Sequence, residues 1–168
     1  MLAHGLILAA TVLVLDQLSK WAFYASLTGL PFWAAAPLPL PRAPGIEVTG
    51  FFNLVTVWNH GISFGMFNQG SAQSAWIFAV LALAITGGLV TWLSRAPGRL
   101  IATALGAVIG GAIGNVVDRL RLGAVFDFLD VHLLGWHWPA FNVADAAISL
   151  GVGLLLFDAL FAPKPSAK

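Results

Sequence analysis

Cysteine is absent from this sequence, and charged residues are scarce. The lack of cysteine excludes disulfides, thiolate metal sites, iron–sulfur clusters and cysteine nucleophiles. Only 9% of the 168 residues are Asp, Glu, Lys or Arg, whereas a soluble domain carries about a quarter. The net charge of +1 and the scattered basic residues offer no electrostatic surface for a polyanion, so we expect no nucleic-acid partner.

Long apolar runs are what the sequence has in abundance. Hydrophobic residues make up 59% of the chain, and the mean hydropathy is +0.88. Since a transmembrane helix needs about 20 mostly apolar residues, four segments qualify: 2–23, 75–93, 100–117 and 142–161. We therefore predict an all-α membrane protein with four transmembrane helices, forming one membrane-embedded domain over residues 1–168.

The region between the first two predicted spans, residues 26–74, is too long to be a turn. Its prolines predict an irregular loop over residues 31–44. Residues 46–58 are rich in Val, Thr, Phe and Trp and predict short strands, which would form a small sheet on the membrane surface. Four spans put both termini on one side, and the count of basic residues places that side inside by a margin of one.

Charges inside apolar segments need a reason, because burying them in a bilayer is costly. Asp16 and Lys20 lie four residues apart on the first span, and the plainest interpretation is a local ion pair. Asn115 and Asp118 share a face at the end of the third span, where Arg119 follows them. These polar residues therefore gather near one end of their helices.

Two further acids can meet at that same end. Asp127 follows the third span and Asp145 lies one turn into the fourth, and these consecutive spans are antiparallel. Two carboxylates beside hydrocarbon are expected to share a proton, because desolvation and like charge both oppose a second ionisation. A shared proton is what aspartic proteolysis needs. The structural alternative is that Asp127 caps a helix and Asp145 pairs with Arg119 or Arg121.

Two other motifs allow different chemistry. Residues 61–65 match the Gly-x-Ser-x-Gly nucleophile elbow, but that motif is meaningful only between a strand and a helix of an α/β-hydrolase, with a catalytic triad that this chain cannot accommodate. Asp130, His132 and His137 are possible metal ligands, although their spacing fits no common zinc signature. A metal site is therefore a weaker hypothesis than the acid pair.

Two non-enzymatic interpretations also use these residues. A small ion- or proton-coupled carrier would need acids along a path between the two membrane faces, and Asp158 is the acid nearest the other face. A membrane scaffold would need none of the acids for its function. The alternatives differ in whether the acids lie at one face or at both.

Five short motifs, taken in order along the four-span layout, point to a family. They are Asp16-Gln17-x-x-Lys20, Asn59-x-Gly61-x-x-Phe64, Gly114-Asn115-x-x-Asp118-Arg119, Val125-Phe126-Asp127-Phe128 and Phe141-Asn142-x-Ala144-Asp145-x-Ala147. In these motifs the chain resembles lipoprotein signal peptidase (signal peptidase II), the four-span aspartic peptidase family of the bacterial inner membrane.

The resemblance implies an endopeptidase that removes the signal peptide from diacylglyceryl-modified prolipoproteins by cutting just before the lipidated Cys. Asp127 and Asp145 fall on the catalytic positions of the family. The supporting and substrate-binding positions fall on Asn59, Gly61, Asn115, Arg119, Asn142, Asp16, Lys20 and Asp118. The family uses no metal or cofactor. Asp130 is an extra acid without an assigned role.

The resemblance also implies partners and a location. The partners would be lipid-modified prolipoproteins, membrane lipids and inhibitors of the globomycin type. Both termini would be cytoplasmic, and the active site would lie at the periplasmic face of the inner membrane. The small β-cradle of the family corresponds to residues 46–58, and its short amphipathic surface helix corresponds to residues 61–70.

Overall fold

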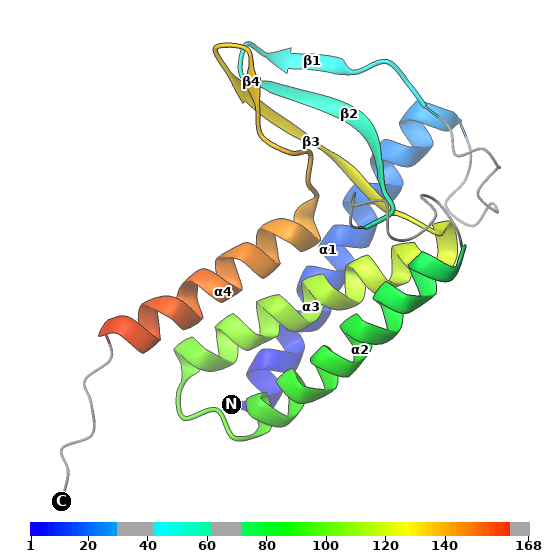
Figure 1. The fold of residues 1–168 in the computed structure, drawn as a ribbon. Coiled ribbons are helices and arrows are strands. Elements are labelled where there is room, and N and C mark those ends of the chain that lie inside the picture. The colour runs from blue at the N-terminus through cyan, green and yellow to red at the C-terminus, as the bar shows by residue number, and fades with distance from the viewer. Residues whose placement is uncertain (30–41, 62–71, 162–168) are drawn as a thin grey trace, which may run out of the picture.

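The structure, a computed structural model, describes residues 1–29, 42–61 and 72–161. Its four helices are α1 (Leu2–Thr28), α2 (Ala72–Ser94), α3 (Arg99–Leu122) and α4 (Val143–Phe161). All four are long and apolar enough to cross a membrane, which confirms the predicted four-helix membrane fold. The N-terminus and the end of α4 lie at the same end of the bundle (Figure 1).

Helix α3 is the centre of the bundle. Of the residues in its most apolar stretch, 72% are buried inside the protein, against 11–17% in the other three helices. Helices α1, α2 and α4 therefore turn most of their surface outward. Glycine lets the neighbouring helices approach α3 closely. A Cβ added at Gly110 would lie 2.5 Å from the carbonyl oxygen of Ala9 on α1, and one at Gly111 would clash with the carbonyl of Ala144 on α4. Such contacts between small residues hold membrane helices together without polar groups.

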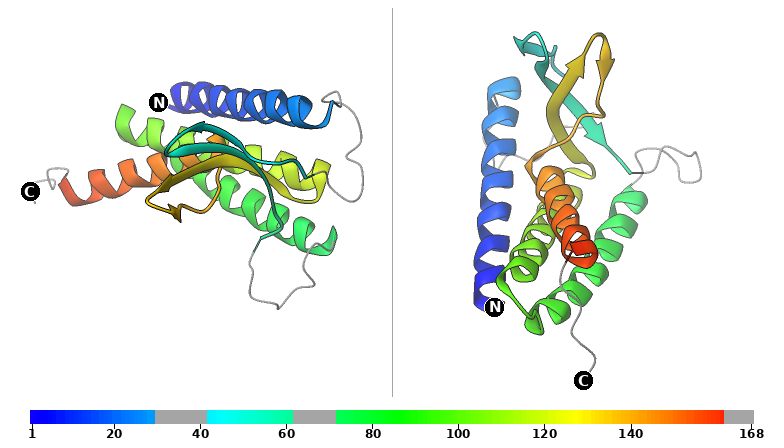
Figure 2. Two further views of the ribbon diagram at one scale, coloured as in Figure 1. Left: turned by 90° about the horizontal axis from the view of Figure 1, so that it is seen from above. Right: turned by 90° about the vertical axis from the view of Figure 1, so that its left-hand side faces the viewer.

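A four-stranded antiparallel sheet stands at the other end of the bundle, as the two further views make clear (Figure 2). Its strands, in spatial order, are β1 (Ile46–Thr49), β2 (Phe52–Asn59), β3 (Val125–Leu133) and β4 (Trp136–His137). The first two confirm the predicted strands. The second two lie in the connection between the third and fourth spans, where no strand was predicted. Two acids interrupt the apolar pattern of β3 and conceal its period.

The alternation of side chains along β3 aims Asp127 away from the aromatic core. Phe126 and Phe128, each 1% exposed, pack with Tyr24 in a buried aromatic cluster. The Phe126 ring also stacks on Trp58 of β2, with ring centroids 4.8 Å apart. Because successive residues of a strand point to opposite faces, Asp127 projects from the other face of β3. The aromatic packing thus fixes the direction of this acid.

Several predictions concern residues outside the described part of the chain. Most of the proline-rich loop over 31–44 and nearly all of the surface helix over 61–70 belong to this group. Residues 62–65, which are all of the Gly-x-Ser-x-Gly match except Gly61, also belong to it.

Candidate active site

Asn142 joins the two acids that the sequence singled out. Its side-chain Nδ2 donates to Asp127 Oδ1 at 2.6 Å, and its backbone N–H donates to Asp145 Oδ2 at 3.2 Å. The backbone N–H of Asp145 in turn donates to Asn142 Oδ1 at 2.9 Å. Asn142 is fully buried and Asp127 is 1% exposed. Strand β3 and the first turn of α4 therefore meet at a single amide side chain.

The reciprocal bonds of Asn142 and Asp145 form a capping box. Asn142 directly precedes Val143, the first residue of α4, and Asp145 is the third residue of the helix. In this arrangement the cap side chain accepts from the third backbone N–H, while the third side chain accepts from the cap N–H. Local helix chemistry thus fixes the position of Asp145. The spacing Asn-x-x-Asp in the sequence is the signal that could have revealed it.

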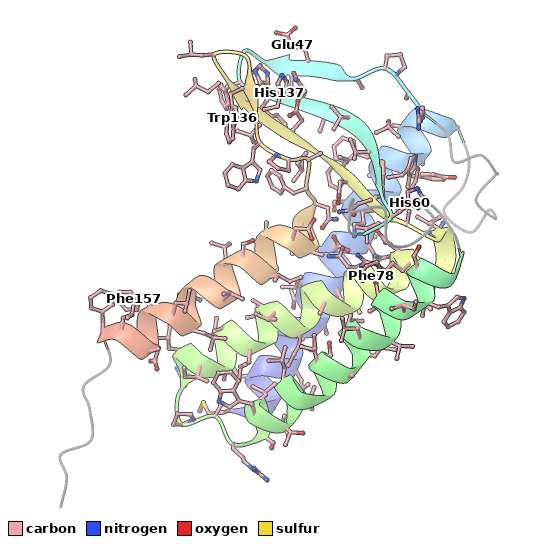
Figure 3. The ribbon with its side chains drawn as sticks, in the orientation of Figure 1. Glu47, His60, Phe78, Trp136, His137 and Phe157 are labelled. Atoms are coloured by element: carbon pink, nitrogen blue, oxygen red, sulfur yellow. The ribbon has the colours of Figure 1, made fainter. Side chains whose placement is uncertain are left out.

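Asn59 holds the other oxygen of Asp127. At the end of β2, Asn59 Nδ2 donates to Asp127 Oδ2 at 3.1 Å. The backbone N–H of Gly61 donates to Asn59 Oδ1 at 3.0 Å and so orients the amide. Gly61 has a φ of +106°, and any added Cβ would collide with the Phe78 ring, which lies close to the end of β2 near His60 (Figure 3). Glycine is therefore required at position 61.

The environment of Asp127 favours its protonated form. Burial raises the pKa of its carboxyl group most strongly, and the nearby Asp145 raises it further. Hydrogen bonds from Asn59 and Asn142 and the charge of Lys20 oppose the rise, and the resulting pKa is about 7. This is the direction expected for two carboxylates that compete for ionisation in an apolar place. Asp127 lies within a strand, so it does not cap a helix as the structural alternative required.

Asn115 on α3 supports Asp145 from the opposite side. Its Nδ2 donates to Asp145 Oδ1 at 2.8 Å, and its Oδ1 accepts from Lys20 Nζ at 3.3 Å. Arg119, one turn further along α3, donates from Nη1 to the backbone carbonyl of Asn115 at 3.2 Å. The Arg119 guanidinium also lies over the Phe78 ring, 5.7 Å from its centroid. Asn115 therefore connects the acid pair to the buried charges of α1.

Those buried charges form a triad of two acids and one lysine. Lys20 Nζ lies 2.9 Å from Asp16 Oδ2 and 2.9 Å from Asp118 Oδ2. The predicted pair on α1 is thus present, and it also reaches α3. Asp118 Oδ2 additionally accepts from the backbone N–H of Phe126 at 3.1 Å, which ties the start of β3 to α3. The triad therefore holds β3 in place one residue before Asp127.

Two partners of this triad were not named from the sequence as site residues. Gln17 donates from Nε2 to Asp16 at 3.1 Å and to Asp118 at 3.0 Å. The backbone N–H of Ala144 donates to Asp16 Oδ1 at 2.9 Å and so brings α4 to α1. Gln17 stands inside the first motif, which was the available signal. A backbone contact such as that of Ala144 leaves no trace in residue identity.

Every residue of the predicted site belongs to one connected set of hydrogen bonds and ion pairs. This set comprises Asp16, Lys20, Asn59, Gly61, Asn115, Asp118, Arg119, Asp127, Asn142 and Asp145. It lies at the end of the bundle that carries the sheet. Asp158, the acid that a carrier would need, lies about 20 Å further along α4 from Asp145, at 1.5 Å per residue.

Asp130 belongs to a separate cluster in the sheet. Its carboxylate oxygens lie 2.9 Å from His137 Nδ1, and Asn53 donates to it at 2.9 Å. Burial alone would raise the pKa of Asp130, but the hydrogen bonds from His137 and Asn53 and the nearby imidazoles hold it below its ordinary value. His132 stacks on His137, with ring centroids 4.8 Å apart. Within the described ranges, no three His, Cys, Asp or Glu residues could hold a metal ion.

Four membrane helices with two linked acids at one end, Asp127 on strand β3 of the small sheet and Asp145 in the first turn of α4, define a membrane protein with a polar site at the end of its helices. Residues 8–161 match the family model described as signal peptidase (SPase) II. The chain therefore belongs to the signal peptidase II family.

Curated relatives agree with this assignment. A lipoprotein signal peptidase of Rhizorhabdus wittichii is 44% identical over 162 residues, which cover 96% of this chain and 88% of the relative. One of Methylorubrum extorquens is 42% identical over 165 residues, covering 97% and 88%. Two solved structures of bacterial membrane enzymes share the fold, with TM-scores of 0.75 and 0.71 at 23% and 24% identity. These matches cover 95% and 98% of this chain and 94% of each enzyme chain.

Proposed function

We propose that this protein is an aspartic endopeptidase that removes the signal peptide from diacylglyceryl-modified prolipoproteins, cutting just before the lipidated Cys. The observation that carries the proposal is the double link of Asn142, which bonds Asp127 through its side chain and Asp145 through its backbone. Membership of the signal peptidase II family supports the same conclusion.

In the proposed reaction the two acids share one proton. The ionised acid takes a proton from a water molecule while the oxygen of that water attacks the carbonyl carbon of the scissile amide. The protonated acid donates a hydrogen bond to the carbonyl oxygen and later a proton to the leaving nitrogen. The raised pKa of Asp127, about 7, supports a pair with one ionised and one protonated acid, because it keeps one proton on the pair near neutral pH.

The supporting residues hold the acids in place. Asn59 and Asn142 each occupy one oxygen of Asp127, and Asn115 occupies one oxygen of Asp145. Fixed partners of this kind keep reacting groups in the geometry of attack, which lowers the entropic part of the barrier. The triad around Lys20 acts one step further away, by joining α1 and α3 to the start of β3.

The position of the acids suits a lipid-anchored substrate. The site lies at the end of the spanning helices, where the acyl chains of a substrate can stay in the bilayer while the scissile bond reaches the site. We infer that both termini are cytoplasmic and that the site faces the periplasm across a bacterial inner membrane. The ligands would be lipid-modified prolipoproteins, membrane lipids and globomycin-type inhibitors, without a metal or cofactor.

The test uses purified protein and a diacylglyceryl-modified prolipoprotein. Asp127→Asn and Asp145→Asn should each lower cleavage by roughly 10²- to 10⁴-fold, the range that general acid–base catalysis contributes. Asp158→Asn is the matched control, since Asp158 shares helix α4 with Asp145 but lies outside the connected set, and it should retain activity. Mass spectrometry should find the lipidated Cys at the new N-terminus. Near-normal cleavage by either dyad variant would refute the assignment.

A further inference from the structure

The turn that joins β3 to β4 has an unexpected occupant. Leu133 pairs with Trp136, so Leu134 and Gly135 are the two central residues of a tight hairpin turn. Both have positive φ, 51° and 81°, as in the turns that select Asn-Gly or Asp-Gly. Leucine is unfavourable there because its Cβ crowds the backbone. Within the described ranges, Leu134 is the one non-glycine residue with positive φ.

The same turn is exposed and apolar. Leu134 is 98% exposed, and Leu133, Trp136 and Trp138 are 56–67% exposed. We call these four residues the hairpin tip. From position 131 to position 144 the chain has no Lys, Arg, Asp or Glu. In water, both the backbone conformation and the exposure of Leu134 would favour a small polar residue, so the choice of leucine needs a different surrounding.

The hairpin of β3 and β4 projects over the side of the molecule on which α4 lies. Figure 1 and the view from above in Figure 2 both show the hairpin reaching out over α4 rather than over α1. Helix α4 turns large apolar side chains outward, among them Leu150 at 69% and Phe157 at 56% exposure. The hairpin tip and the outward apolar surface of this membrane-spanning helix thus lie on the same side of the molecule.

The two faces of the sheet differ in chemistry. Trp136 lies on the side of the sheet that faces α4, whereas Glu47 of β1 points away from the helices (Figure 3). Beneath the hairpin is a hollow of about 310 Å³ lined by Val131, His132, Leu133, Trp136, Trp138 and Phe141. Tryptophan is enriched at the boundary between lipid and water, because its ring is apolar and its N–H is polar. The face toward α4 therefore has the composition of a lipid-facing surface.

We propose that the hairpin tip inserts into the lipid of the bilayer that the four helices cross, with Leu134 as its deepest residue. Lipid surrounds Leu134 with apolar neighbours and offsets the unfavourable backbone conformation of the turn. The tip is the far end of β3, the strand that carries Asp127. Its insertion anchors this strand to the membrane surface at a second point, besides its attachment to α3 through Asp118.

The absence of cysteine makes a depth measurement direct. Leu134→Cys, Phe157→Cys and Glu47→Cys would each carry a nitroxide spin label in the full chain, reconstituted in bilayers of phosphatidylethanolamine and phosphatidylglycerol. Phe157 is the reference for lipid and Glu47 the reference for water. The label at position 134 should be accessible to oxygen and shielded from a water-soluble nickel complex, like the label at position 157. If nickel reaches it as readily as the label at position 47, the proposal is wrong.

A second variant tests the turn without any label. Asn is the residue that this turn prefers in water, so Leu134→Asn should raise the midpoint of thermal unfolding if the turn faces water. If the tip is inserted, the same change places an amide in lipid, and the midpoint in nanodiscs should fall. A raised midpoint in nanodiscs would contradict the insertion. Neither measurement depends on cleavage, so the outcome is independent of the proposed peptidase activity.

Discussion

Asn142 donates from its side-chain amide to Asp127 at 2.6 Å, across 15 positions of sequence. The same residue caps α4, so one side chain sets both the start of a membrane helix and the orientation of an acid on a strand. The two acids are therefore held relative to each other by a short connection through one residue. These contacts, and those of the helices around them, lead to five predictions.

Substitutions of Asn142 should separate its two roles. Asn142→Ala removes the cap and the bond to Asp127, so we expect a loss of about 1 kcal/mol in stability and of roughly 10²-fold in cleavage. Ser also caps helices well but is too short to reach Asp127, so Asn142→Ser should keep most of the stability and still lose activity. Thermal unfolding and kcat measured on the same samples would check this.

The matched control for Asn142 is Asn53→Ala. Asn53 is also an amide bonded to a buried acid, but its partner is Asp130 in the outer part of the sheet. Its loss should leave kcat nearly unchanged. Equal losses from both substitutions would mean that activity depends on the general integrity of the sheet rather than on the link between the acids.

Cleavage should decline as the pH rises above about 7. Burial and the neighbouring Asp145 raise the pKa of Asp127 to about 7, so the pair loses its shared proton above this pH. The measurement is kcat between pH 5 and pH 9 with the lipidated substrate. A rate that keeps rising to pH 9 would contradict a shared proton.

The free energy of unfolding should also depend on the protonation of Asp127, and it should fall as the pH rises. The folded protein holds a proton on Asp127 up to about pH 7, whereas the unfolded chain releases it near the ordinary value of 3.8. Between these values the folded state binds more protons, so this group's contribution to the free energy of unfolding falls as pH rises. Asp127→Asn should flatten the dependence of the unfolding midpoint on pH in that window. An unchanged slope would show that Asp127 titrates normally.

Removal of Lys20 should destabilise the helix bundle more than removal of one acid. Lys20→Met leaves Asp16 and Asp118, which are 0% and 3% exposed, without their shared cation. Breaking a buried pair in this way costs about 3–5 kcal/mol. Asp16→Asn leaves the Lys20–Asp118 pair intact and should cost less. Thermal unfolding in detergent, followed by circular dichroism, would compare the two, and the reverse order would disprove the bridging role.

Alanine substitutions at two glycines should have opposite effects. Gly110→Ala places a Cβ 2.5 Å from the Ala9 carbonyl oxygen and 2.8 Å from Val12 Cβ, so α1 and α3 must separate. Overpacking of this kind costs about 1–3 kcal/mol. At Gly87 on α2 an added Cβ meets no atom within 4 Å, so Gly87→Ala should be neutral or slightly stabilising. The unfolding midpoints of both variants, measured in the same detergent, test the contrast.

Much of the fold could be predicted because it depends on local composition. Four apolar runs of about 20 residues are long enough to predict four membrane-spanning helices. The segment rich in Val and Thr predicted the strands that the structure shows as β1 and β2. Strand β3 was missed because Asp127 and Asp130 break its apolar pattern. The partners of these buried acids include two amides far along the chain, Asn59 and Asn53. No local rule anticipates such partners.

The sequence by itself was enough to predict that the protein lies in a membrane and that it has four spanning helices. It also contains the motifs that place the chain in its family and the two acids that could meet. The tertiary structure alone decided that Asn142 links those acids, that Lys20 bridges two helices and that Leu134 stands exposed at the tip of a hairpin. The physical reason is that apolar length and local spacing are properties of neighbouring residues. The contacts of a buried polar group depend on helix rotation and strand register, which only the packed chain sets.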